Sequence, residues 1–108
     1  MNLQTQLNEI INVINNNDFV RAHDLFEDLW RKYKNDEKTR KESFILKAFV
    51  NGTVCIELYK MKRINHSINV WSTYKKYEYL IDEFKTINST KYQEIKQLIY
   101  KKREEFIK

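Results

Sequence analysis

The sequence of 108 residues contains no proline, one glycine and one cysteine. Because hairpins and tight turns depend on glycine and proline, this shortage argues against a fold rich in β-strands. A single cysteine cannot form a disulfide within the chain, which excludes a disulfide-stapled scaffold and is typical of a reducing compartment. One glycine cannot make a glycine-rich phosphate-binding loop, and the sequence contains no nucleophile elbow.

Long hydrophobic runs are missing as well. The most apolar stretch, residues 44–61, is interrupted by Lys47, Asn51 and Glu57, so we expect no membrane span. Residues 1–4 lack the basic and apolar regions of a signal peptide. Abundant Asn, Ile and Lys indicate AT-rich codons, as in a low-GC bacterium or a plastid. We therefore expect a soluble intracellular protein of the cytoplasm or the plastid stroma, without a membrane partner.

Charge alone does not assign a partner. The chain carries 20 lysines and arginines against 15 aspartates and glutamates, a net charge of +5 at pH 7. A basic surplus can attract nucleic acid, but here the basic clusters are spread over separate segments among acids, which is typical of a solvated surface. The aromatic and basic residues of 71–79 have the composition of a nucleobase-stacking surface. Tyr74 and Tyr77, however, have the spacing of the apolar face of a helix, so we favour packing in the core for both. Core packing does not account for Tyr79 or for Trp71.

Apolar residues that recur at intervals of three and four predict five helices in a single domain, residues 1–108. The helices are expected at about 3–14, 17–33, 42–62, 65–85 and 90–106. We expect Asn65 to cap the fourth helix, and Thr90 with Gln93 to form a capping box for the fifth. The predicted fold class is therefore an all-α bundle.

The third expected helix is apolar around nearly its whole circumference, which is typical of a buried helix. We therefore place it at the centre of the bundle. Ala48, Gly52 and Cys55 fall on one side of it, where small residues let a neighbouring backbone approach closely and justify a glycine inside a helix. Because no activating base is evident in the sequence, we interpret Cys55 as an inert core thiol.

One spacing raises a question of chemistry. His23 and Glu27 lie one helical turn apart on the face of the second helix that also bears Trp30. Such a pair can share a proton or bind a metal. Zinc needs three or four ligands, so others would have to come from another helix, where Glu57 and Asn51 are the inward polar candidates. From spacing alone, we favour a buried histidine that is satisfied by its helix neighbour and fixes packing.

These residues also carry a family resemblance. The pattern His23-x-x-x-Glu27-x-x-Trp30, introduced by Phe19 and Ala22, resembles the signature helix of the domain-of-unknown-function 309 family, whose members are small and all-helical. The resemblance continues through the central helix and covers roughly residues 18–80.

The resemblance implies a function only in part. The family has been labelled a predicted metal-dependent hydrolase, and it often carries a second histidine late in the central helix. This sequence has Glu57 in that region, and Asp24 where the family usually has Glu. The resemblance therefore implies a divalent metal at His23 and Glu27 only if Glu57 replaces the missing histidine as a ligand.

Three functions follow from these patterns. The sequence lacks a complete catalytic constellation, so we rank first a non-catalytic binding or scaffold module with a protein partner. The second is a metal-dependent hydrolase-like protein, in which His23, Glu27 and Glu57 hold a divalent ion that activates water. The third, which we rank last, is binding of nucleic acid through the basic surface.

Overall fold

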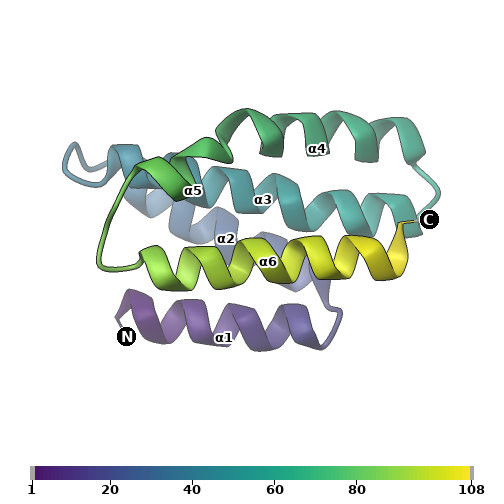
Figure 1. The fold of residues 1–108 in the computed structure, drawn as a ribbon, viewed down its shortest axis with the longest axis horizontal. Helices are drawn as coiled ribbons and strands as arrows, with labels where there is room; N and C mark the ends of the chain where they lie inside the picture. The colour runs from purple at the N-terminus through teal and green to yellow at the C-terminus, as the bar shows by residue number, and fades with distance from the viewer. Residues whose placement is uncertain (1, 108) are drawn as a thin grey trace.

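A computed structural model describes residues 2–107, so Met1 and Lys108, the ends of the expected domain range, lie outside the described residues. In the described part every regular element is a helix. The helices are α1 (Leu3–Asn15), α2 (Phe19–Lys34), α3 (Arg40–Lys60), α4 (Ile64–Tyr77), α5 (Tyr79–Glu83) and α6 (Ser89–Phe106). All but the short α5 run roughly along the longest axis of the molecule (Figure 1). The predicted all-α bundle is confirmed.

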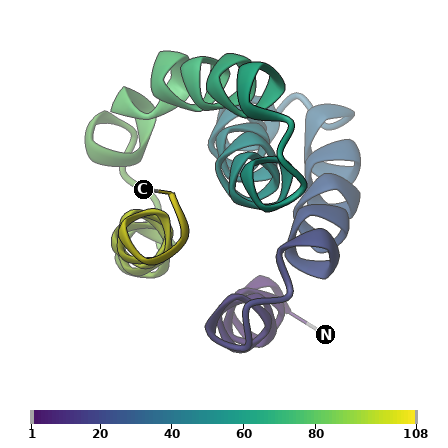
Figure 2. The same ribbon diagram turned by 90° about the vertical axis from the view of Figure 1, so that its right-hand side faces the viewer.

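Helix α3 lies at the centre of the packing. It packs most extensively against α2 and α4, and it also contacts α5 and α6. Seen end on, α1 to α4 follow one another along a curve, and α6 returns to lie beside α1 (Figure 2). The prediction of a buried central helix is confirmed, because its buried residues lie on most sides of the helix.

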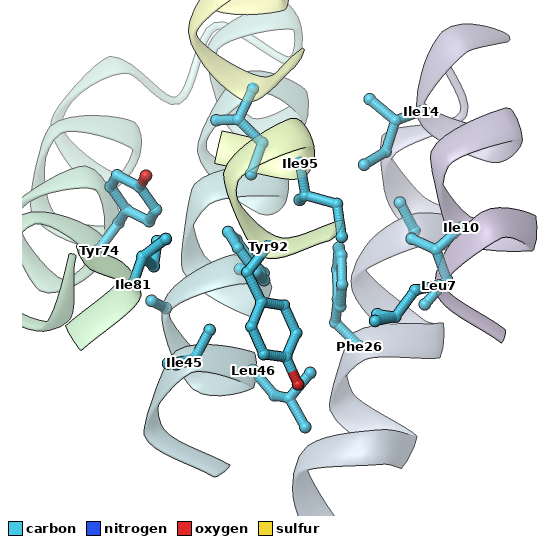
Figure 3. Packing of buried hydrophobic residues seen from close by; sticks show 14 of the residues in the cluster. Leu7, Ile10, Ile14, Phe26, Ile45, Leu46, Tyr74, Ile81, Tyr92 and Ile95 are labelled. Atoms are coloured by element: carbon cyan, nitrogen blue, oxygen red, sulfur yellow. The ribbon is translucent and has the colours of Figure 1, made fainter. Parts of the chain in front are cut away.

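The hydrophobic core joins the long helices through large buried side chains. Figure 3 shows side chains from α1, α2, α3 and α6 pointing toward one another, among them Leu7, Ile10, Phe26, Leu46 and Tyr92. The rings of Phe26 and Phe49 are 5.2 Å apart, and those of Phe49 and Tyr92 are 6.0 Å apart. Burying an apolar side chain of this size contributes about 1.5–3 kcal/mol, so this row of rings stabilises the contact of α2, α3 and α6.

The two predicted helix caps were wrong. The fourth helix begins at Ile64, one residue before the expected cap Asn65, because Lys62 takes a left-handed backbone conformation (φ 65°) and turns the chain there. The fifth expected helix, now α6, begins at Ser89 without a side-chain cap. The expected capping partner Gln93 instead donates to Asp82 Oδ1 at 2.5 Å, so it ties α6 to α5.

The single helix expected over residues 65–85 is broken after Tyr77. The intervening residue, Glu78, accepts hydrogen bonds from Lys75 Nζ at 2.8 Å and from the Tyr100 hydroxyl at 2.5 Å. These contacts accompany a change of direction that buries Leu80 and Ile81 and leaves Tyr79 56% exposed.

None of the helices within residues 2–107 is long and apolar enough to cross a bilayer.

Candidate functional site

Helix α2 sets the register of the predicted site. Its first turn is capped by Asp18, whose side chain accepts a hydrogen bond from the backbone N–H of Arg21 at 3.1 Å. From that start, His23, Glu27 and Trp30 fall on neighbouring turns of one helix face. The His23 Nε2 atom lies 3.4 Å from Glu27 Oε2, and the two side chains are 25% and 26% exposed. They lie at the edge of the core rather than inside it.

Neighbours on α2 supply further partners for this pair. The Nδ1 atom of His23 lies 3.1 Å from Asp24 Oδ1, and the Glu27 carboxylate also accepts a hydrogen bond from Arg31. Asp24 and Asp28 are exposed, as predicted. The prediction that a neighbour on the same helix satisfies the hydrogen bonding of His23 agrees with this geometry. The prediction that His23 is buried does not, because the imidazole is partly open to solvent.

The third predicted metal ligand does not join the pair. Glu57 forms an ion pair with Lys60 at 3.7 Å on its own helix, and Asn51 donates to the backbone carbonyl of Lys47. Across residues 2–107 the structure places no group of three or more His, Cys, Asp or Glu side chains where they could hold a metal ion. The structure therefore brings two predicted ligands together and leaves Glu57 apart, so a metal at His23, Glu27 and Glu57 stays a prediction.

Trp30 packs against the core and meets two lysines. Lys34 Nζ lies 4.2 Å from the centre of the indole ring, and Lys47 Nζ of α3 lies 5.5 Å from it. Lys47 Nζ is also 5.7 Å from the ring of Tyr77 on α4. Lys47 therefore lies between Trp30 of the predicted site and Tyr77 of α4.

Tyr77 borders a groove that could not be predicted from the sequence. An open groove of about 410 Å³, here called the aromatic groove, is lined by Lys41, Phe44, Tyr77, Tyr79 and Leu80. It lies where the start of α3 meets the junction of α4 and α5. Phe44 and Tyr77 stack with ring centres 5.6 Å apart and an interplanar angle of 13°.

Comparison with models of protein families identifies the family of the chain. The model of a domain of unknown function (DUF309) matches residues 7–70. The chain belongs to this family. The DUF309 match includes most of α1, which the expected range 18–80 omitted, and it ends within α4, before the aromatic groove is complete. No curated protein and no solved structure matches the chain.

Three lysines give the surroundings of the aromatic groove a positive charge. Lys47 Nζ and Lys76 Nζ lie 5.7 and 5.5 Å from the ring centre of Tyr77, and Lys41 Nζ lies 5.0 Å from that of Phe84. In the part of the DUF309 chain that the structure describes, none of these three forms an ion pair with a carboxylate, whereas four other lysines do. Their charges are therefore available to an anionic partner.

A polar cluster of structural character ties the first helix of the DUF309 chain to the rest. The Glu42 carboxylate of α3 accepts hydrogen bonds from the Tyr92 hydroxyl and from Asn88 Nδ2, the latter at 2.9 Å. Asn88 Oδ1 in turn accepts a hydrogen bond from Gln4 Nε2 of α1 at 2.6 Å. Burial and the neighbouring Glu42 carboxylate raise the pKa of Tyr92, so the phenol stays protonated and remains a donor.

Proposed function

We propose that this DUF309 protein is a non-catalytic binding module whose aromatic groove docks a protein partner. Phe44 and Tyr79, which are 37% and 56% exposed, border an open groove beside three lysines that have no carboxylate partner within residues 2–107. Exposed aromatic side chains in a concave surface are typical of binding sites, because their burial releases water from large apolar areas.

The chemistry of the partner follows from the surface. A side chain that fills the groove must be apolar to match Phe44, Tyr77 and Leu80. Carboxylates beside it would meet Lys41 and Lys76, and such charge complementarity speeds association and selects partners. We therefore infer a protein segment with a large apolar residue flanked by aspartate or glutamate.

A protein partner accounts for this surface better than nucleic acid does. The Tyr77 ring already stacks on Phe44 and has Lys47 and Lys76 nearby, so the face of the ring that Phe44 covers cannot stack on a nucleobase. A single strand would also need a longer basic track to follow its phosphates. Weak binding of oligonucleotides with a steep loss of affinity as salt rises would instead support the electrostatic alternative.

The test compares affinity capture from native cell extract by wild-type protein and by a variant that carries Phe44→Ser and Tyr79→Ser. The proposal predicts that the wild type recovers a stoichiometric partner and that the variant loses it. Ile87→Ser is the matched control, because Ile87 is a 92% exposed apolar residue outside the groove. Equal recovery by all three proteins, or recovery of the DUF309 protein alone, would contradict the proposal.

A second candidate rests on the proximity of His23 and Glu27. A nitrogen and a carboxylate oxygen 3.4 Å apart can bind one divalent ion if further ligands come from water or substrate, and such an ion could activate water for hydrolysis. This candidate ranks second, because its predicted third ligand, Glu57, pairs with Lys60 instead.

A further inference from the structure

A second groove lies on α4 and the C-terminal part of α6, apart from the aromatic groove. It has a volume of about 270 Å³ and is lined by Tyr59, Ile64, Ser67, Ile68, Trp71, Arg103 and Ile107. Most of the lining residues are apolar, and two of these residues, Ile64 and Ile68, are 41% and 60% exposed. We call it the Arg103 groove, because Arg103 is the charged residue in this lining.

The Arg103 guanidinium is held in place without being neutralised. It lies 3.7 Å from the ring centre of Trp71, and its Nη1 donates to Cys55 Sγ at 3.4 Å. Within residues 2–107, no carboxylate forms an ion pair with it, unlike Arg21 and Arg31. A guanidinium carries five N–H donors, so most of its donors have no hydrogen-bond partner among these residues.

The residues around Arg103 leave its positive charge uncompensated and hold its side chain in place. Burial raises the pKa of the Cys55 thiol, so the sulfur next to Arg103 is neutral at physiological pH. Trp71 stacks on Tyr74 with ring centres 4.6 Å apart and packs edge-on against Tyr100 at 5.4 Å. The indole that supports the guanidinium is thereby fixed before any ligand arrives, which lowers the entropy lost on binding.

We propose that the Arg103 groove binds a free medium-chain carboxylic acid. A planar carboxylate matches the fork of guanidinium donors and can accept two of them at once. The alkyl chain would cover Ile64, Ile68 and Ile107, which removes apolar surface of both molecules from water. A volume near 270 Å³ suits a small ligand, since sites for drug-sized molecules begin at about 300 Å³.

The binding experiment follows Trp71 fluorescence during titration with decanoate. A Trp30→Phe background leaves Trp71 as the one tryptophan, because the chain has two. The proposal predicts saturable binding that tightens about fourfold for each methylene added between hexanoate and decanoate. It also predicts that decanol, which lacks the charge, binds at least about tenfold more weakly than decanoate.

Variants separate this site from adsorption to any apolar surface. Arg103→Gln should weaken decanoate binding by about tenfold or more, and Ile68→Glu should weaken it by placing a negative charge at the exposed rim. Arg21→Gln is the matched control, because it removes the same charge from an exposed arginine that is paired with Glu9, and its affinity should equal that of the wild type. Circular dichroism melts establish that each variant is folded.

Several results would overturn the proposal. They are the absence of a fluorescence change at millimolar decanoate, equal affinity for decanol and decanoate, and an undiminished affinity of a folded Arg103→Gln variant. The aromatic groove has no lining residue in common with this site, so the outcome here is independent of the proposed function.

Discussion

Gly52 of α3 faces the ring of Tyr74 of α4 so closely that a Cβ atom on Gly52 would lie 3.0 Å from Tyr74 Cδ1. A second neighbour, Ile99 Cδ1 of α6, would lie 3.2 Å away. The lone glycine of the chain therefore sits where α3, α4 and α6 meet. It allows a fully buried tyrosine ring to lie directly against the backbone of the central helix.

This contact predicts that Gly52→Ala destabilises the protein. Alanine would favour the helix by about 1 kcal/mol, but overpacking a buried contact costs about 1–3 kcal/mol, and the Tyr74 ring, held by Trp71, has little room to move. We expect the free energy of unfolding to fall by about 1 kcal/mol, measured by urea denaturation. A more stable Gly52→Ala protein would show that the two helices can move apart.

Two buried tyrosines should respond differently to loss of the hydroxyl. The Tyr74 hydroxyl is buried near the Glu78 carboxylate but has no hydrogen bond of good geometry among residues 2–107, whereas the Tyr92 hydroxyl donates to Glu42. Tyr74→Phe removes an unsatisfied group, so stability should stay the same or rise by about 1 kcal/mol, while Tyr92→Phe should lose about 1–3 kcal/mol. Equal losses in thermal unfolding would mean that Tyr74 has a partner in solution.

The carboxylate at the helix break predicts a pH-dependent stability. Burial opposes ionisation of Glu78, but hydrogen bonds from Lys75 and Tyr100 prevail and hold its pKa below the ordinary 4.5. The ionised form is therefore favoured by folding, so its contribution is complete above pH 4.5 and is lost as the pH falls through the lowered pKa. Glu78→Gln should be about 1 kcal/mol less stable than wild type at pH 7.

The difference between wild type and Glu78→Gln should shrink below about pH 4, as followed by urea unfolding at several pH values. Glu94→Gln, which changes an exposed residue of α6, is the control and should give a small difference at every pH. A constant difference for Glu78→Gln down to pH 3 would contradict the lowered pKa.

The partly exposed position of His23 predicts a modest role in stability. A fully buried histidine changed to alanine would cost about 1–3 kcal/mol of stability. With the imidazole 25% exposed and paired on its own helix, we now expect His23→Ala to lose less than about 1 kcal/mol. A larger loss in urea unfolding would indicate that the imidazole is buried in solution.

The same pair allows a test for metal. If His23 and Glu27 do not hold an ion, purified protein should contain less than stoichiometric divalent metal, and a chelator should leave its melting temperature unchanged. A stoichiometric metal that is lost in His23→Ala would favour the hydrolase-like alternative.

The helical stripes in the sequence were sufficient to predict the bundle. The positions of Leu7, Phe26 and Ile95 follow from their spacing of three and four, and all three are buried. The break after Tyr77 could not be predicted in this way, because it is accompanied by hydrogen bonds between Glu78 and a tyrosine 22 residues further along, Tyr100. Local pattern contains no information about such a distant partner.

The candidate sites were predictable to a lesser degree. A helical wheel correctly places His23 beside Glu27, but it cannot tell the edge of the core from its interior. Phe44 is the first residue of the apolar stretch 44–61, and only the packing of α3 against the α4–α5 junction shows that its ring borders an open groove with Tyr79. The Arg103 groove depends on α4 and α6 together, so neither helix reveals it alone.

Site-specific photo-crosslinking tests the binding module most directly. A photoreactive phenylalanine analogue replaces Tyr79 in the aromatic groove or, as the control, Ile87 outside it. After irradiation in native extract, we expect one discrete protein adduct from position 79, absent from position 87 and reduced by Phe44→Ser. The same adducts from both positions, or no adduct from position 79, would contradict it.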